Sequence, residues 1–115
     1  MKKFKVGALF SGVGGIELGF TSTKKFEISW ANELDKYCAR TYRENFNHTF
    51  LEEDINNLNG KELNEVDILV GGFPCQAFSY AGLKKGFKDT RGTMFFEIAR
   101  ILKYHKPKGI LLENV

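Results

Sequence analysis

Apolar residues are distributed along the chain in short runs, which predict strands, with amphipathic or polar stretches between them. Five runs rich in apolar, β-branched and aromatic residues have the length of strands: residues 5–10, 26–32, 48–53, 66–70 and 108–115. The fourth and fifth runs lack the alternation of a half-buried strand. This pattern predicts parallel strands that are buried on both faces.

Helical stretches lie between the strand candidates. Residues 16–20 predict a short helix after the first strand. Asp35 is a suitable N-cap for a second helix that extends to about residue 46. Cys38 is spaced from two aromatic residues of this helix as core-facing positions are, so we interpret it as structural.

A last helix is predicted from about residue 93 to residue 106. Basic residues near its end complement the helix dipole, and Pro107 ends it. Its apolar stripe consists of Met94, Phe95, Ile98, Ile101 and Leu102.

A glycine-rich turn joins the first strand to the first helix. Its residues are Ser11, Gly12, Val13, Gly14 and Gly15. A strand, a glycine turn and a helix form a nucleotide-type site in doubly wound folds, because the helix amino end favours a carboxylate or phosphate. Taken alone the signal is weak, since it lacks the third glycine of the dinucleotide fingerprint and the lysine of a P-loop.

Acidic residues follow the second and third strand candidates. Glu33 comes about 20 positions after the glycine turn, where such folds bind ribose hydroxyls; the alternative is a solvated charge at a strand end. Asp54 could accept a hydrogen bond from an adenine amino group while Ile55 packs on the ring. Asp54 could equally cap the next turn.

A cysteine follows the fourth strand candidate. Gly71 and Gly72 are expected to break that strand, and Pro74 cannot donate a ladder hydrogen bond. Cys75 is therefore predicted in a loop at the carboxyl end of a strand, where open α/β sheets bind ligands. A buried, unreactive cysteine is the common alternative, but this context favours a nucleophile.

Composition narrows the class of protein. The 115 residues suit one domain, and no run approaches the length of a membrane span, so we expect a cytoplasmic protein without membrane contact. Its two cysteines and two histidines form no metal or disulfide pattern. The net charge of +3 permits nucleic-acid binding. Four basic residues after Cys75 suit a lid over a polyanion, or a solvated loop: Lys84, Lys85, Lys88 and Arg91.

Six blocks in order resemble the C5-cytosine DNA methyltransferases, most of all the bacterial restriction–modification type. The resemblance spans nearly the whole chain. The blocks are Phe10-Ser11-Gly12-Val13-Gly14-Gly15, Glu33-Leu34, Asp54-Ile55, Gly72-Phe73-Pro74-Cys75-Gln76-Ala77-Phe78-Ser79, Arg91-Gly92-Thr93-Met94-Phe95-Phe96 and Glu113-Asn114-Val115.

The resemblance implies a doubly wound, mostly parallel, Rossmann-like α/β sheet of strand order 3-2-1-4-5, incomplete beyond strand 5. The cofactor would be S-adenosylmethionine, bound where strands 1 and 4 diverge. The cofactor-binding residues that it implies are Phe10, Ser11, Gly12, Val13, Gly14, Gly15, Glu33, Leu34, Asp54, Ile55, Gly72, Pro74 and Met94.

The same resemblance implies a catalytic pair, Cys75 and Glu113, at the ends of neighbouring strands about 5 Å apart. The Cys75 thiolate would add to carbon 6 of a cytosine flipped out of double-stranded DNA. Glu113 would stabilise the ring through nitrogen 3 and the exocyclic amine. The residues expected to contact DNA are Gln76, Ser79, Lys84, Lys85, Lys88 and Arg91.

Residues 1–115 resemble only the cofactor-binding and catalytic part of such an enzyme, with no target recognition domain. The last strand would form an exposed apolar edge. We therefore expect a complementary chain, or the C-terminal half of a longer one, to complete it, and we expect the fragment alone to be inactive. Other functions remain open: a non-catalytic S-adenosylmethionine-binding subunit, a dinucleotide-dependent oxidoreductase, or the same chemistry on transfer RNA.

Overall fold

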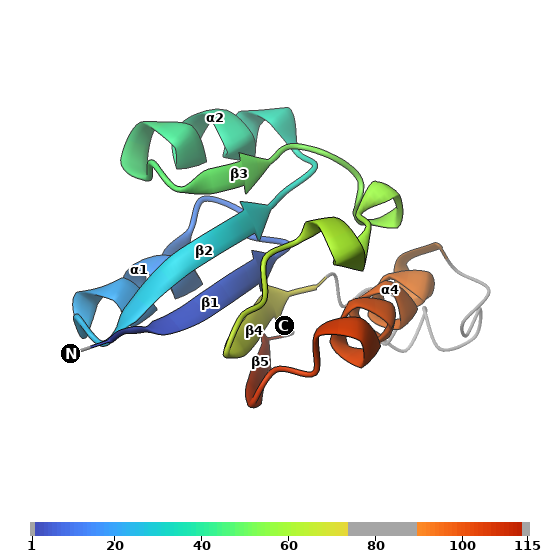
Figure 1. Ribbon diagram of the computed structural model, residues 1–115. Helices are drawn as coiled ribbons and strands as arrows, with labels where there is room; N and C mark the ends of the chain where they lie inside the picture. The colour runs from blue at the N-terminus through green and yellow to red at the C-terminus, as the bar shows by residue number, and fades with distance from the viewer. Residues whose placement is uncertain (1, 74–89, 114–115) are drawn as a thin grey trace.

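A computed structural model describes residues 2–73 and 90–113, which form a five-stranded, all-parallel sheet. The order β3-β2-β1-β4-β5 (Figure 1) confirms the predicted fold class and strand order. The strands are β1 (Phe4–Leu9), β2 (Phe26–Asn32), β3 (Thr49–Leu51), β4 (Ile68–Gly72) and β5 (Gly109–Glu113). The helices are α1 (Gly15–Ser22), α2 (Lys36–Asn45), α4 (Thr90–His105) and the short 3-10 turns η1 (Ile55–Asn57) and η2 (Gly60–Glu62).

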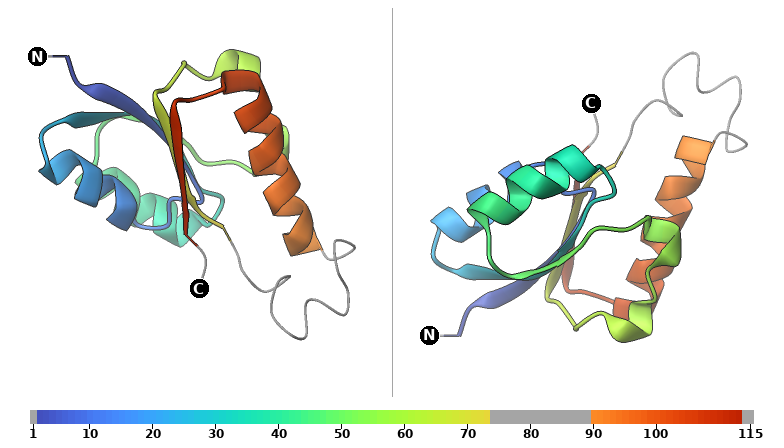
Figure 2. Two further views of the ribbon diagram at one scale, coloured as in Figure 1. Left: turned by 90° about the horizontal axis from the view of Figure 1, so that it is seen from below. Right: turned by 90° about the horizontal axis from the view of Figure 1, so that it is seen from above.

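Helices pack on both faces of the sheet. Figure 2 shows α1 and α2 on one face and α4 on the other. Side chains alternate along each strand, so Leu9 and Leu69 join the core under α4. Val6 and Val70 join the core under α1 and α2. This two-sided burial is why the central strands β1 and β4 read as apolar runs.

The predicted cap of α2 is confirmed. The Asp35 carboxylate accepts hydrogen bonds from the backbone N–H groups of Tyr37, at 2.8 Å, and Cys38, at 3.0 Å. The buried residues of the helix are Ala39 and Tyr42, whereas Cys38 is half-buried. The core-facing position predicted for Cys38 is therefore only partly right.

Helix α4 begins at Thr90, three residues earlier than predicted, and ends at His105. Ile98 and Ile101 are buried against the sheet, as expected from the apolar stripe. Phe95 is exposed, contrary to the prediction, because it lies at the side of the stripe, where its ring is 6.0 Å from that of Phe73.

The expectation that Gly71 and Gly72 break the fourth strand is wrong. Both residues continue β4, where they pair with Leu112 and Glu113 of β5. A Cβ atom at Gly71 would lie 3.1 Å from the backbone oxygen of Leu9 in β1. Glycine therefore lets β1 and β4 approach closely at the point where the two strands end.

Strand β5 is the outer strand on its side of the sheet and carries exposed apolar side chains. Ile110 is 54% exposed and Leu111 is 48% exposed. Burial on both faces, which the composition predicted, is thus not found among the described residues. The exposed apolar edge expected for a sheet that stops at this strand is found instead. No helix in the described part of the chain is long and apolar enough to cross a membrane.

Candidate functional site

A cavity of about 350 Å³ opens at the carboxyl ends of β1, β2 and β3. This is where doubly wound folds bind ligands, and the volume is that of a small-molecule site. The lining residues are Phe10, Asn32, Glu33, Leu34, Asp35, Glu53, Asp54, Ile55 and Met94. Six of these nine residues were predicted from the sequence as cofactor-binding: Phe10, Glu33, Leu34, Asp54, Ile55 and Met94.

The lining of this cavity is acidic. It contains no lysine or arginine among the described residues, and four side chains carry a carboxylate: Glu33, Asp35, Glu53 and Asp54. The remaining wall is largely apolar. Such a lining repels a polyphosphate and suits a ligand that is neutral or carries a positive charge.

The glycine turn beside the cavity depends on left-handed backbone. Phe10, Gly12 and Gly14 have φ values of 52°, 57° and 97°. The Gly14 N–H closes the turn on the carbonyl of Ser11 at 2.9 Å. A Cβ atom at Gly14 would lie 2.3 Å from a ring carbon of Phe46 in the segment after α2. The turn is therefore held close to α2, and residues 11–15 flank the cavity without being among its lining residues.

Glu33 ties this turn to the start of α2. Its carboxylate accepts the backbone N–H of Gly12 at 2.8 Å and that of Asp35 at 2.9 Å, each on a different oxygen. Glu33 is thus more than the solvated strand-end charge of the alternative interpretation. A carboxylate has about four lone-pair positions, so two remain available to a ligand.

Asp54 and Ile55 have a structural role as well as a position in the cavity. Asp54 caps η1, because its carboxylate accepts the backbone N–H of Asn56 at 2.9 Å. The sequence-based alternative, that Asp54 caps the turn after it, is thus confirmed. Ile55 is buried and packs in the core under α4. Both residues nevertheless line the cavity, so a structural role and ligand contact are compatible here.

Asn32 is a residue that the sequence analysis missed. It is buried at the end of β2, and its amide donates hydrogen bonds to the carbonyls of Leu51 and Glu53, both at 2.8 Å. These bonds hold the end of β3 against β2 and thereby fix the acidic wall of the cavity. An asparagine directly before Glu33 in an otherwise apolar strand was the available signal.

Glu17 is a second missed residue and lies in the first turn of α1, 1% exposed. Burial raises the pKa of its carboxyl group, while the Ser11 and Tyr42 side chains act in the opposite direction and Glu33 adds a repulsion that raises it further. The Oγ atom of Ser11 and Oε2 of Glu17 are buried without a hydrogen-bond partner. The hydroxyl group of Tyr42 in turn contacts Nε2 of His48 at 2.6 Å. Polar side chains of the glycine turn, α1 and α2 are therefore buried together beside the turn.

We expect Glu17→Gln to stabilise the fold, and more so as pH rises. A carboxyl group whose pKa is raised by folding contributes its full stability below the pKa of the unfolded chain, and this contribution is lost as pH rises through the folded pKa. Each unit of difference in pKa is worth about 1.4 kcal/mol. Urea unfolding at pH 5, 7 and 8.5 measures the effect. A loss of stability that is equal at all three values would show instead that Glu17 is charged and well paired.

The predicted catalytic residues lie only partly within the described chain. Gly72 and Glu113 are register partners at the ends of β4 and β5. A Cβ atom at Gly72 would lie 3.2 Å from Oε2 of Glu113, so this carboxylate reaches the end of β4. Of Arg91 only the backbone, in α4, is described. The predicted residues outside the described ranges are Pro74, Cys75, Gln76, Ser79, Lys84, Lys85 and Lys88.

Comparison with known proteins gives consistent matches. The profile of the family described as C-5 cytosine-specific DNA methylase matches residues 4–115. Type II methyltransferase M1.ScrFI of Lactococcus lactis subsp. cremoris is 53% identical over 113 residues, which cover 98% of this chain and 29% of the relative. Type II methyltransferase M.SsoII of Shigella sonnei is 50% identical over 113 residues, 98% of this chain and 30% of the relative.

A crystal structure of a prophage-encoded DNA modification methyltransferase (E. coli) superposes with a TM-score of 0.79 at 31% identity. The match covers 98% of this chain and 32% of that one. The chain therefore spans less than a third of the length of each of these three proteins.

Proposed function

Because the chain belongs to the family of C-5 cytosine-specific DNA methylases, we propose that it forms the cofactor-binding and catalytic part of an enzyme that methylates carbon 5 of cytosine in DNA. The methyl donor is S-adenosylmethionine. Relatives named as type II methyltransferases, about half identical over nearly the whole chain, support the reaction. The acidic cavity beside the glycine turn is the observation that carries the proposal.

The charge of the cavity separates two cofactors that use similar folds. S-adenosylmethionine has a positively charged sulfur and no phosphate, whereas a nicotinamide dinucleotide carries a pyrophosphate. Four carboxylates and no basic side chain line the described cavity. This lining attracts the first ligand and repels the second, which argues against the alternative of an oxidoreductase.

Residues around the cavity fit the parts of S-adenosylmethionine. Glu33 keeps two lone-pair positions for ribose hydroxyls beyond the bonds that it makes to Gly12 and Asp35. Asp54 uses Oδ1 for its cap, which leaves Oδ2 to accept the adenine amino group. The amino end of α1 favours the methionine carboxylate. When bound, the cofactor supplies a methyl group on a positively charged sulfur.

The chemistry requires an activated cytosine, because carbon 5 is a poor nucleophile. We propose that the Cys75 thiolate forms a bond to carbon 6, so that carbon 5 can take the methyl group. Loss of the proton on carbon 5 then expels the thiolate and restores the ring. Glu113, at the end of β5 beside β4, holds ring nitrogen 3 and the exocyclic amine and offsets the charge pushed onto the ring.

Reading of the DNA sequence is assigned to segments outside this chain. The described residues include the cofactor cavity and the sheet that carries it, and the relatives are more than three times as long as this chain. The exposed edge of β5 is a suitable surface for such segments, whether they belong to a complementary chain or to the remainder of a longer one.

Trapping with duplex DNA that contains 5-fluorocytosine tests the proposal, since fluorine on carbon 5 prevents the release step. The chain, supplied with the remaining segments of a type II relative and with S-adenosylmethionine, is expected to form a covalent adduct that Cys75→Ser abolishes. Cys38→Ser is the matched control and should leave the adduct intact, because Cys38 lies half-buried in α2.

An adduct that survives Cys75→Ser, or one formed on transfer RNA but not on DNA, would contradict the assignment.

Calorimetric titration of the chain with S-adenosylmethionine and with nicotinamide dinucleotide is the companion measurement. Binding of only the dinucleotide would overturn the cofactor as well.

A further inference from the structure

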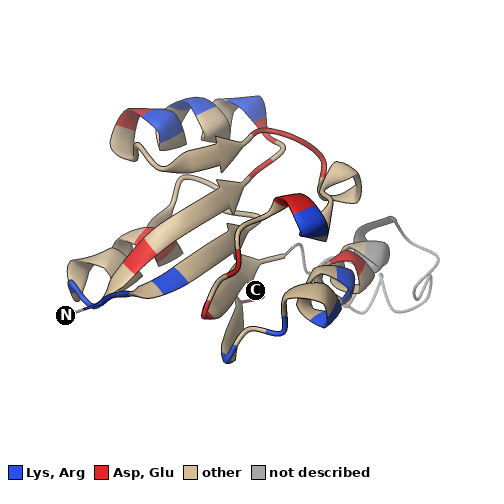
Figure 3. Cartoon of the chain, in the orientation of Figure 1, with Lys and Arg blue, Asp and Glu red and all other residues tan. Residues whose placement is uncertain are grey.

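The edge of the sheet opposite the cofactor cavity carries a concentration of lysines. They lie in the segments that lead into or begin β1, β2 and β5, marked in blue at this edge in Figure 3. These lysines are Lys2, Lys3, Lys5, Lys24, Lys25, Lys106 and Lys108. The carboxylates at the same edge are Glu27, Glu65 and Asp67. The surplus of four positive charges exceeds the net charge of +3 of the whole chain, so the positive potential is localised here.

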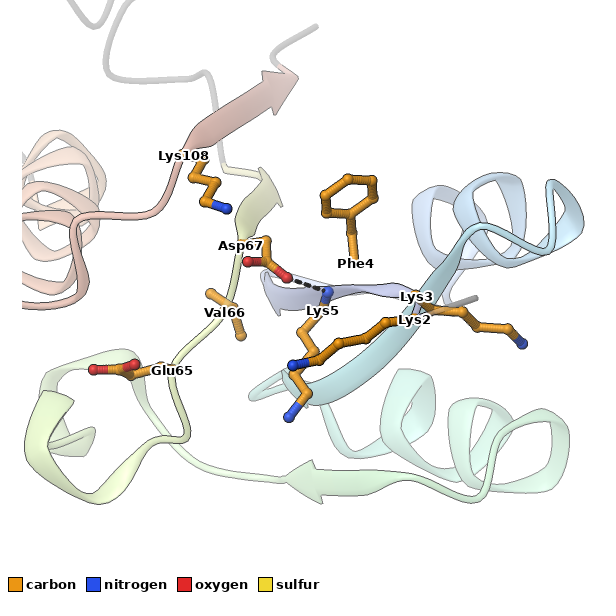
Figure 4. Close-up of a pocket in the computed structure, with 8 residues that line it drawn as sticks. All are labelled: Lys2, Lys3, Phe4, Lys5, Glu65, Val66, Asp67 and Lys108. Atoms are coloured by element: carbon orange, nitrogen blue, oxygen red, sulfur yellow. Dashed lines mark hydrogen bonds between the residues drawn. The ribbon is translucent and has the colours of Figure 1, made fainter.

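A cavity of about 370 Å³ opens within this edge (Figure 4). Phe4, which is 50% exposed, and Val66 supply apolar wall. The charged residues that line it are Lys2, Lys3, Lys5, Glu65, Asp67 and Lys108. Apolar and basic residues that line one cavity are a combination that suits a ligand with phosphate and sugar surfaces.

Asp67 is largely occupied by the fold. Its carboxylate accepts the backbone N–H of Lys5 at 2.7 Å, and its carbonyl accepts that of Lys108 at 2.8 Å. Asp67 thus joins the starts of β1, β4 and β5. The ion pairs between described residues involve Arg43 and Arg100, and none neutralises a lysine of this edge. The ammonium groups are therefore free to bind an anion.

The geometry of the edge matches a stretch of nucleic-acid backbone. Parallel strands are spaced by about 4.8 Å, so the four strands from β2 to β5 extend over about 15 Å. Successive base pairs of a duplex rise by 3.4 Å, and about four phosphates of one strand would face the row of lysines. Strand β1 separates this edge from the cofactor cavity by about 20 Å, the length of six residues.

We propose that this edge binds the phosphate backbone of a duplex DNA segment other than the one that holds the target cytosine. The enzyme would then contact DNA at two places, and the second contact would keep it on the polymer between encounters with targets. The choice of DNA over another polyanion rests on the proposed function. The expectation that this edge binds a polyanion rests on its lysines alone.

The test compares two triple variants of equal charge. K2Q/K3Q/K108Q removes three lysines of the edge, and K36Q/R40Q/R43Q removes three basic residues of α2. Binding of random-sequence duplex is measured between 50 and 200 mM salt. The slope of log K against log salt is negative, and each lost phosphate contact reduces its magnitude by about 0.9. We expect a decrease of about 1.8 to 2.7 for the edge variant and less than about 0.9 for the control.

Equal slopes for the two variants would overturn the proposal, as would tighter binding of poly-glutamate than of duplex by the parent chain. Both variants are expected to bind S-adenosylmethionine as the parent chain does, because the substituted residues do not line the cofactor cavity. Failure of the parent chain to bind this cofactor would count against the proposed function and leave the result at the edge unaffected. Circular dichroism confirms that each variant is folded.

Discussion

Replacement of Trp30 by alanine is expected to lower the free energy of unfolding by about 3–5 kcal/mol, the usual cost of removing a large buried aromatic side chain. Trp30 is 1% exposed in the core under α4. Its indole N–H donates a hydrogen bond to the carbonyl of Asn64 at 2.9 Å. A domain of this size has a total stability of about 5–15 kcal/mol, so this loss is a large share of the total. Urea denaturation followed by circular dichroism measures the loss.

A double-mutant cycle with Gly7 tests the reason for this loss. A Cβ atom at Gly7 would lie 2.5 Å from the Trp30 ring, so Gly7→Ala alone is expected to destabilise the chain. In the Trp30→Ala background the added methyl group would fill part of the cavity instead. The two changes should therefore be strongly non-additive. Additive costs would mean that the two residues do not share this space.

Gly14→Ala is expected to cost about 2–5 kcal/mol of stability and to weaken binding of S-adenosylmethionine more than tenfold. The left-handed backbone of Gly14, with φ of 97°, costs any other residue about 1–2 kcal/mol. The new methyl group would also lie 2.3 Å from the Phe46 ring. Overpacking of this kind costs about a further 1–3 kcal/mol. Movement of Phe46 or of the turn would displace the amino end of α1.

The neighbouring glycine provides the control. Gly15 is the first residue of α1, and nothing lies within 4 Å of the position of its Cβ atom. Gly15→Ala should leave stability unchanged or raise it slightly, because alanine is the better helix former. If thermal unfolding shows equal losses for the two variants, the position of Gly14 against Phe46 is not the cause.

The arrangement of strands and helices was predictable because the apolar runs and caps are local features. The β2 run was predicted with its observed bounds, and Asp35 caps α2 as expected. The error at Gly71 and Gly72 has a non-local cause. Whether a glycine ends a strand or lets another strand approach depends on what lies beside it, here β1 and β5, which are remote in sequence.

The cavity was predictable from strand ends, and its supports were not. Glu33 follows β2 directly, and Asp54 and Ile55 come three and four residues after the end of β3, so strand order brings them together. Glu17 was missed because it is a charged residue on the core-facing side of α1, where Ile16 and Phe20 pack against the core, while the apolar Leu18 is exposed. A carboxyl group buried against the arrangement of its helix cannot be recognised from apolar spacing.

The order in which the strands pair has a consequence for synthesis on the ribosome. Each strand after the first joins a neighbour that has already been translated: β2 pairs with β1, β3 with β2, β4 with β1 and β5 with β4. A nascent polypeptide can thus build this sheet outward in two directions without leaving a gap for a later strand. The sheet that carries the cavity at the ends of β1, β2 and β3 can thus form while the chain is still being translated.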